Sequence, residues 1–224
     1  CTSGMSGSGS DLCTVIENKF DTNVHSVFLN PPFATESTFC RRIDDHILQF
    51  KFYFDHPSLM PSTAYIGIGS NLGSPKKNCD QAIDLIRNHP EISTTTQSPY
   101  YETEPVGPKN QGWFINAVIQ VQTNLEPSAL LTILFDVEKE MGRIRRGKWG
   151  PRIIDLDLLF YGDRVINNET LKLPHPEVAN RRFVLEPLCD IAADFIHPVL
   201  KKTMKELLSQ LQDFHKAHRI DESS

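Results

Sequence analysis

Apolar residues along this chain of 224 residues recur with strand-like spacing in some segments and with helical spacing in others. The order of these segments restricts the folds that the chain can adopt. Short apolar runs or strict apolar–polar alternation mark three segments as strands, and a fourth is polar and rich in threonine. The predicted strands are residues 63–69, 92–101 (the Thr-rich one), 114–123 and 152–161. Turn residues and helical patterns separate these segments, so both kinds of element must pack together.

Helical spacing occurs between these strands and after the last one. Ser74-Pro75 is a typical helix start, and the apolar stripe that follows stops before Pro90. A second helix is predicted from Pro127 to Gly142, and a tail helix carries the apolar residues of 200–211. The order predicts an α+β fold: one compact domain with a ferredoxin-like βαββαβ core and added C-terminal strands and helices.

The composition changes near residues 57–61. Residues 1–62 open with a Ser/Gly-rich run, hold three of the five cysteines and keep no helical period beyond a turn or two. We expect residues 1–62 to be a poorly ordered N-terminal extension and residues 63–224 to form the folded domain. Frequent acidic residues and few arginines argue against a targeting peptide in this extension.

Charge and cysteine usage exclude several classes of protein. The net charge of −5 argues against nucleic-acid binding driven by charge, and no apolar run approaches the length of a membrane span. The five cysteines are scattered without a CxxC pair, so neither a zinc site nor a disulfide framework is favoured. We therefore expect a cytoplasmic protein that binds neither membranes nor nucleic acid.

Two aspartates, Asp155 and Asp157, stand on the last predicted strand among apolar neighbours. Side chains alternate across a strand, so both carboxylates face the same way, roughly 6–7 Å apart. A solvated strand face is the structural alternative, but unpaired carboxylates among such apolar residues would be costly. Two carboxylates at this spacing suit a hard cation such as Mg²⁺, so the pair predicts a metal site.

Six basic residues lie within 139–152, directly before these aspartates. Basic residues that follow the C-terminal end of a helix also complement the helix dipole, and this structural role alone explains why some of them occur here. Their closeness in sequence to Asp155 and Asp157 instead favours a polyphosphate site. The glycines among the cations indicate a loop that can close over a substrate.

Phe114 and Asn116 project from one face of the predicted strand 114–123. A ring beside an amide suits a flat heteroaromatic ligand, although ordinary core packing explains Phe114 equally well. A buried Asn116 on an otherwise apolar strand needs a polar partner. His175, in the proline-bounded loop 174–183, is a surface residue or a phosphate donor.

Other familiar motifs are incomplete. The turn at 67–73 fails the G-x-G-x-x-G pattern because Leu72 takes the place of the third glycine, and no Walker lysine follows. We therefore interpret it as a tight strand-to-helix turn. The sequence has no H-E-x-x-H, no G-x-S-x-G and no recognised Cys–His spacing, so hydrolysis by a covalent nucleophile is unsupported.

Four segments together resemble the 6-hydroxymethyl-7,8-dihydropterin pyrophosphokinase family of the folate pathway. They are residues 64–73, 103–116, 142–157 and 174–183, in the same order and at similar spacing. The Trp-Gly-Pro-Arg-x-x-Asp-Leu-Asp segment within the third is highly specific to that family. The resemblance covers residues 63–212, and the extension before it has no counterpart in the usual single-domain form.

The resemblance implies transfer of the terminal diphosphate of ATP to the pterin hydroxymethyl group, with release of AMP. It implies that Asp155 and Asp157 hold two Mg²⁺ ions and that Arg143 and Arg152 stabilise the moving phosphates. The residues implied for ATP binding are Glu138, Arg145, His175 and Arg181. Those implied for pterin binding are Thr103, Pro105, Gly107, Phe114, Asn116, Trp149 and Phe183. No residue of the sequence stands out as a general base.

Two other functions stay open. One is a different Mg-dependent phosphotransferase such as a nucleotidyltransferase, although those enzymes place Gly-Ser much nearer to the paired aspartates than Ser70 lies to Asp155. The other is a ferredoxin-like RNA-binding module, but the predicted strands lack the aromatic-rich signature of such modules. We expect a monomer whose partners are the small molecules ATP and 6-hydroxymethyl-7,8-dihydropterin.

Overall fold

An antiparallel sheet organises the part of the chain that the computed structural model describes, residues 60–108, 110–143 and 150–220. The strand order is β5-β1-β4-β3-β8, and β2 also pairs with β4. The strands are β1 (Ser62–Ser70), β2 (Ile92–Gln97), β3 (Tyr100–Thr103), β4 (Phe114–Thr123), β5 (Asp155–Tyr161) and β8 (Ala217–Ile220). Almost all of the predicted extension 1–62 lies outside the described residues, so its character stays a prediction.

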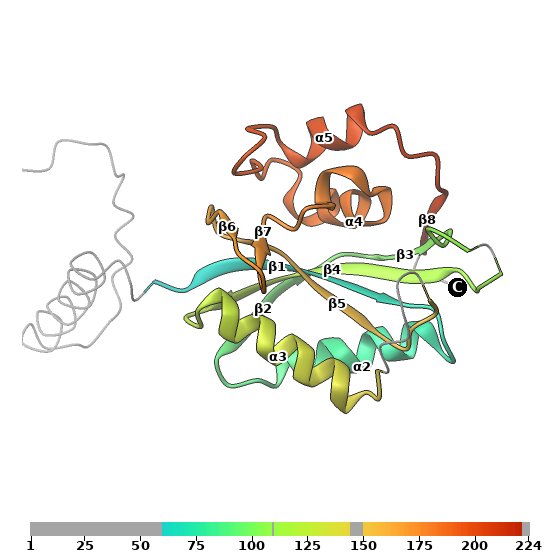
Figure 1. Ribbon diagram of the computed structural model, residues 1–224, viewed down its shortest axis with the longest axis horizontal. Coiled ribbons are helices and arrows are strands. Elements are labelled where there is room, and N and C mark those ends of the chain that lie inside the picture. The colour runs from blue at the N-terminus through green and yellow to red at the C-terminus, as the bar shows by residue number, and fades with distance from the viewer. Residues whose placement is uncertain (1–59, 109, 144–149, 221–224) are drawn as a thin grey trace, which may run out of the picture. The chain divides into compact units, whose positions relative to one another are not determined.

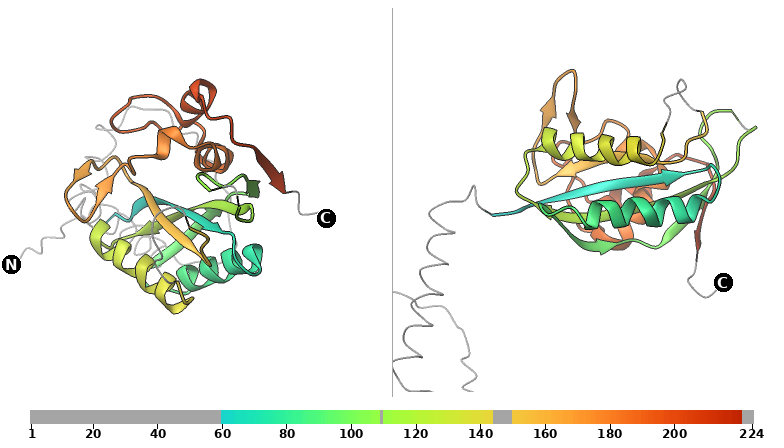
Figure 2. Two further views of the ribbon diagram at one scale, coloured as in Figure 1. Left: turned by 45° about the vertical axis from the view of Figure 1, so that its right-hand side comes forward. Right: turned by 90° about the horizontal axis from the view of Figure 1, so that it is seen from below.

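Helices cover both faces of the sheet (Figure 1). One face carries α2 (Pro75–Arg87) and α3 (Pro127–Glu140), which lie side by side in the right-hand view of Figure 2. The other face carries α4 (Arg182–Ala192) and α5 (Met204–Gln210). The connections include the short pair β6 (Ile166–Asn167) and β7 (Lys172–Leu173) and the 3-10 turn η2 (Val178–Asn180). None of the helices described here has the length and apolar character needed to span a bilayer.

The alternation of side chains along the central strands builds a core on each face. Ala64, Ile66 and Ile68 of β1 belong to the cluster that α2 and α3 complete. Tyr65, between them in sequence, belongs to the opposite cluster with Leu185 of α4. Because β1 is buried from both sides, it is a fixed platform, and the residues at its end are held in place.

The predicted strand over 92–101 is two strands in the structure. β2 and β3 both pair with β4, and Ser98-Pro99 separates them. Pro99 has no N–H to donate to a ladder. The Ser98 hydroxyl instead accepts a hydrogen bond from the backbone N–H of Val118 at 2.9 Å. The single strand was predicted from the polar, Thr-rich composition of residues 92–101, and that prediction gave no weight to Pro99.

Two features near the C-terminus also differ from the prediction. Residues 174–183 were expected to be a loop throughout, but Arg182 and Phe183 begin α4. α4 contains Pro187, and proline is unfavourable in the interior of a helix. The N-cap residue of α4, Arg181, makes no side-chain cap. The tail helix is shorter than 200–211, because Thr203 and Glu206 form a capping box that starts α5 at Met204.

One buried histidine, His197, links folding to pH. Its Nδ1 accepts hydrogen bonds from the N–H groups of Val199 and Leu200 at 3.2 and 3.1 Å. Its ring packs edge-on against Phe160 with centroids 5.4 Å apart. Burial lowers the pKa of His197 below its ordinary value, against a smaller opposing effect of its own backbone. The folded protein therefore holds this imidazole in its neutral form.

We predict that acidification destabilises the fold through His197. In the unfolded chain this side chain takes up a proton near pH 6.5, while the folded state resists it, so the free energy of unfolding falls as pH drops through that value. His197→Asn keeps an acceptor but cannot titrate. The loss of unfolding free energy between pH 7.5 and 5.5, measured by urea denaturation, should be smaller in this variant. An equal loss in both proteins would contradict the assignment.

Candidate active site

A cavity of about 640 Å³ gathers residues from β1, β3, β4, β5, α3 and α4. Most of the site residues predicted from the sequence line it: Thr103, Phe114, Asn116, Glu138, Arg143, Arg152, Asp155, Asp157, His175, Arg181 and Phe183. Arg145 and Trp149 lie outside the described residues. Pro105 and Gly107 do not line the cavity; their neighbours Glu104 and Val106 do.

Asp155 and Asp157 lie on β5 and pair with Gly69 and Gly67 of β1. Their side chains share one face of the sheet, as the alternation predicted, and both line the cavity. The glycines at the paired positions of β1 carry no side chain, and Leu159 and the Asn116 amide lie where a Cβ atom would otherwise stand. The strand pairing therefore presents both carboxylates to whatever occupies the cavity.

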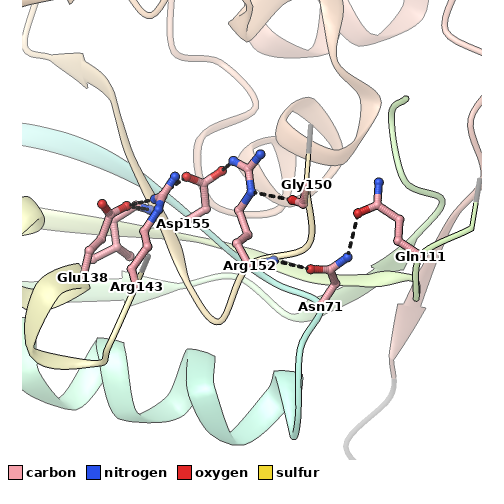
Figure 3. Close-up of polar contacts among 8 residues, drawn as sticks. Asn71, Gln111, Glu138, Arg143, Gly150, Arg152 and Asp155 are labelled. Carbon is pink, nitrogen blue, oxygen red and sulfur yellow. Dashed lines mark hydrogen bonds and ion pairs between the residues drawn. The ribbon is translucent and has the colours of Figure 1, made fainter. Parts of the chain in front are cut away.

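Asp155 is compensated by two guanidinium groups. Arg143 lies 2.6 Å from one oxygen of Asp155, and Arg152 pairs with the other. Arg143 also pairs with the buried Glu138. Figure 3 shows the resulting row of alternating charge, made by Glu138, Arg143, Asp155 and Arg152. The Glu138 carboxylate also accepts a hydrogen bond from the N–H of Leu156 at 2.8 Å, which fixes the end of α3 against β5.

Asp157 differs from Asp155 in having no direct partner in the part of the chain that the structure describes. Within the described ranges, no hydrogen bond or ion pair reaches its carboxylate. Burial raises the pKa of Asp157, and the charge of Asp155 raises it further, against weaker opposing effects of His175, Arg181 and Arg143. A carboxylate in this position is stabilised by any cation that enters the cavity.

The two aspartates fit a magnesium site that a substrate completes. In residues 60–108, 110–143 and 150–220, no group of three or more His, Cys, Asp or Glu side chains could hold a metal ion by itself. Mg²⁺ is commonly held by one or two carboxylates together with substrate phosphates and water. The half-buried carboxylate of Asp157, which has no ion pair within the described ranges, lies beside Asp155 and matches that pattern, with the remaining ligands left to a bound polyphosphate.

The same cavity also holds a buried amide, across β1 from Asp155. Asn116, which is 6% exposed, donates a hydrogen bond to the hydroxyl of Thr103 at 2.6 Å. The Asn116 oxygen also lies close to β1, since a Cβ atom added to Gly69 would come within 2.7 Å of it. The polar partner expected for Asn116 is therefore Thr103, and Gly69 provides the room for the amide. Phe114 and Phe183 line the same cavity from β4 and α4.

Asn71 organises the loops around the cavity, and the sequence interpretation missed it. Its side-chain oxygen accepts a hydrogen bond from the N–H of Arg152 at 2.8 Å. Its amide group donates to Gly112 O at 3.1 Å and to the side chain of Gln111 at 3.2 Å. One buried amide thus joins the end of β1 to two loops (Figure 3). The signal was present, because an Asn that directly follows a buried strand must find partners, but the turn was interpreted only by its glycines.

Comparison with known proteins adds sequence relatives. A family model described as 7,8-dihydro-6-hydroxymethylpterin-pyrophosphokinase (HPPK) matches residues 65–193. The 2-amino-4-hydroxy-6-hydroxymethyldihydropteridine pyrophosphokinase of Haemophilus influenzae is 40% identical, over 71% of this chain and 98% of that protein. The Aquifex aeolicus protein of the same name is 43% identical, over 65% and 89%. A folic acid synthesis protein of Pneumocystis carinii is 42% identical over 70% of this chain but only 21% of its own length.

Solved structures share the fold at much lower identity. Wild-type HPPK-DHPS of Plasmodium falciparum with SDX-DHP gives a TM-score of 0.53 at 17% identity, over 66% of this chain and 43% of that one. An HPPK-DHPS in complex with substrates gives 0.56 at 15%, over 68% and 43%. This chain spans less than half of the length of those proteins. The likeness supports a mixed α/β fold built on an antiparallel sheet.

The site geometry and the relatives converge on one family. The matched region begins in β1 and ends just after α4, so it includes every cavity-lining residue named above. The Haemophilus influenzae protein is matched along nearly its whole length. The chain therefore belongs to the 7,8-dihydro-6-hydroxymethylpterin-pyrophosphokinase family.

Proposed function

We propose that this protein transfers diphosphate from ATP to the hydroxymethyl group of 6-hydroxymethyl-7,8-dihydropterin and releases AMP, as a step of folate biosynthesis. The observation that carries the proposal is the pair Asp155 and Asp157, which lines the same cavity as the Asn116–Thr103 hydrogen bond. The part of the cavity at the two aspartates, called the phosphate end, suits a metal-bound polyphosphate, and the part at Asn116 and Phe114, called the pterin end, suits a flat polar ring. Family membership supplies the chemical identity of both ligands.

At the phosphate end, the aspartates and arginines have separate tasks. Asp155 and Asp157 would hold two Mg²⁺ ions together with the phosphate groups of the substrate. When bound, the metal neutralises phosphate charge and makes the substrate hydroxyl a better nucleophile. Arg143 and Arg152, held beside Asp155 in the structure, bind the oxygens of the transferring diphosphate. Glu138, Arg145, His175 and Arg181 bind the nucleotide.

At the pterin end, Phe114 and Phe183 stack on the two faces of the ring, and the Asn116 amide pairs with its edge. Thr103 orients that amide through the hydrogen bond described above. Pro105 and Gly107 shape the loop behind Glu104 and Val106, and Trp149 covers the bound ring. This arrangement would hold the hydroxymethyl group toward the arginines and aspartates.

The chemistry that follows needs positioning and charge compensation more than a strong base. The hydroxymethyl oxygen attacks the β-phosphorus, the bond from that phosphorus to the α,β-bridging oxygen breaks, and AMP leaves with the bridging oxygen. The arginines must exchange part of their pairing with Asp155 for the phosphate oxygens as the nucleotide binds. We assign no general base, and the hydroxyl proton passes to solvent in this proposal.

Three further properties belong to the same proposal. The strand order β5-β1-β4-β3 supports a ferredoxin-like core with β8 added at the edge. The free thiols of Cys79 and Cys189 support a reducing, cytoplasmic setting. We also propose that the enzyme is a monomer, which sedimentation velocity would test.

Incubation with ATP, Mg²⁺ and 6-hydroxymethyl-7,8-dihydropterin, followed by chromatography, tests the function. We expect AMP and the pterin diphosphate in equal amounts. Release of inorganic pyrophosphate would point instead to a nucleotidyltransferase. Unchanged ATP and pterin, with a folded protein, would contradict the proposal.

We predict that Asp157→Asn abolishes turnover without weakening the fold. Catalysis should fall by at least about 100-fold, the scale of a lost transition-state electrostatic contact. The raised pKa of Asp157 means that its charged form costs stability near pH 7, so the metal-free variant should melt at the same temperature or higher. MgATP should raise the melting temperature of the wild type but not of the variant. Asp163→Asn, an exposed control, should behave as wild type, and a fully active Asp157→Asn would refute the metal assignment.

We predict that Gly69→Ala impairs the pterin end selectively. The new methyl group would meet the Asn116 oxygen at 2.7 Å and displace the amide from Thr103. The KM for the pterin should rise about tenfold, as for one lost hydrogen bond, while the KM for ATP changes little. Gly112→Ala is the control, since its methyl group would stand 3.6 Å from the nearest atom. Equal effects of the two substitutions would argue against this steric account.

We predict that Asn71→Ala lowers kcat/KM by about 10- to 100-fold, because the backbone N–H of Arg152 would lose its acceptor and small displacements of catalytic groups are costly. Steady-state kinetics with both substrates would measure the loss. Asn110→Ala, an exposed amide in a neighbouring loop, is the matched control and should keep normal rates. A normal rate in Asn71→Ala would show that the loops hold their positions without it.

A further inference from the structure

The C-terminal strap, residues 213–220, follows α5 and lies beyond the region that the family model matches. Figure 1 shows it running from the α4–α5 layer down to the edge of the sheet, where β8 lies beside β3. The strap contributes no lining residue to the cavity described above. It nevertheless contacts two elements that do line that cavity.

The first anchor joins the strap to the start of α4. One oxygen of Asp213 accepts a hydrogen bond from the N–H of Arg182, the first residue of α4, at 2.9 Å. The other oxygen accepts from the N–H of His215 at 2.9 Å and lies 2.6 Å from its ring nitrogen. The Asp213 carbonyl also accepts from the side chain of Arg182 at 3.1 Å. Because the N-cap residue Arg181 makes no side-chain cap of its own, Asp213 caps α4 from a distance.

The second anchor joins the strap to the loop between β3 and β4. Lys216 exchanges hydrogen bonds with Glu104: its carbonyl accepts from the Glu104 N–H at 3.1 Å, and its N–H donates to the Glu104 carboxylate at 3.2 Å. The ring of His218 stacks on Trp113, with centroids 5.7 Å apart and planes 9° from parallel. β8 also pairs with β3 along its whole length.

The first anchor holds the start of α4, and the second holds the loop between β3 and β4. Residues in or beside both segments belong to the proposed pterin site. Phe183 follows the capped N–H of Arg182 in the first turn of α4, while Thr103 and Phe114 flank the loop held by Lys216 and His218. We propose that the strap acts as a clasp that sets the gap between Phe183 and Phe114, with Asp213 and His218 as positioning residues for pterin binding. This inference rests on the proposed function.

The state of the Asp213 side chain agrees with such a role. It is 9% exposed, whereas the neighbouring Phe214 is 94% exposed. Burial raises the pKa of Asp213, but hydrogen bonds from the N–H groups of Arg182 and His215 and from the His215 ring outweigh it and lower the pKa below its ordinary value. The carboxylate therefore remains charged and bonded while the aromatic residue beside it is solvated.

Equilibrium binding of 6-hydroxymethyl-7,8-dihydropterin, in the presence of Mg²⁺ and an ATP analogue with a methylene α,β-bridge, tests the clasp. Asp213→Ala should raise the pterin Kd about tenfold, the scale expected for a lost helix cap. Asp213→Asn, which keeps an acceptor for the Arg182 N–H, should recover most of the affinity. His218→Ala should also weaken pterin binding, and Phe214→Ala, the matched control, should not.

The double variant Asp213→Ala/His218→Ala separates a clasp from two independent contacts. If both residues act on one gap, its loss of affinity should be smaller than the product of the single losses. The Kd of the ATP analogue alone, measured without pterin, should change less than the Kd of the pterin in every variant. A multiplicative loss, unchanged pterin binding in either single variant, or equal loss for both ligands would overturn the inference.

Amide hydrogen exchange of the ligand-free protein gives a readout that does not depend on the proposed function. The ring of His218 stacks on Trp113, outside α4. His218→Ala should nevertheless speed exchange in the first turn of α4, and Phe214→Ala should leave it unchanged. No acceleration there would overturn the clasp even if pterin binds normally. Failure of the wild type to bind pterin or form AMP would instead overturn the proposed function, and faster exchange would still establish that the strap couples the two elements.

Discussion

Placing two carboxylates side by side on a buried strand is the constraint around which this site is built. Asp155 and Asp157 cannot both be charged in an apolar setting without compensation. The fold compensates only one of them internally, through Arg143 and Arg152, and leaves Asp157 without a direct partner among the described residues. In the proposed function, cations that enter with a polyphosphate would remove the residual electrostatic cost. Substrate affinity is thereby linked to a charge imbalance in the empty protein.

The uneven charge compensation of Asp155 and Asp157 depends on a rigid part of the sheet, where β5 pairs with β1. β1 is buried on both faces and pairs with β4 and β5, so the polar groups at its end hold fixed positions. Gly69 leaves space for the Asn116 amide, and Asn71 ties β1 to the backbone of Arg152. The proposed phosphate and pterin ends of the site would therefore both be positioned by β1. Their separation is set by backbone pairing rather than by flexible side chains.

Much of this arrangement could be predicted from the sequence where periodicity and chemistry coincide. The alternation of β5 places both aspartates on one face, and helical spacing with proline starts gives α2 and α3. What could not be predicted depends on contacts between distant residues. α4 is capped by Asp213, which lies 31 positions away from Arg182, and Asn71 reaches Arg152 across 81 positions. No pattern of neighbouring residues in the sequence indicates such pairs.

The interruption at Ser98-Pro99 affects the tendency of the protein to aggregate at high concentration. An edge strand with a long, regular row of free N–H and C=O groups invites another chain to extend the sheet. Here β2 is six residues long with a register shift between Thr94 and Thr96, Pro99 offers no N–H, and β8 covers β3. A neighbouring molecule finds no straight ladder on this side of the sheet. The interruption at Ser98-Pro99 thus disfavours edge-to-edge aggregation of the enzyme.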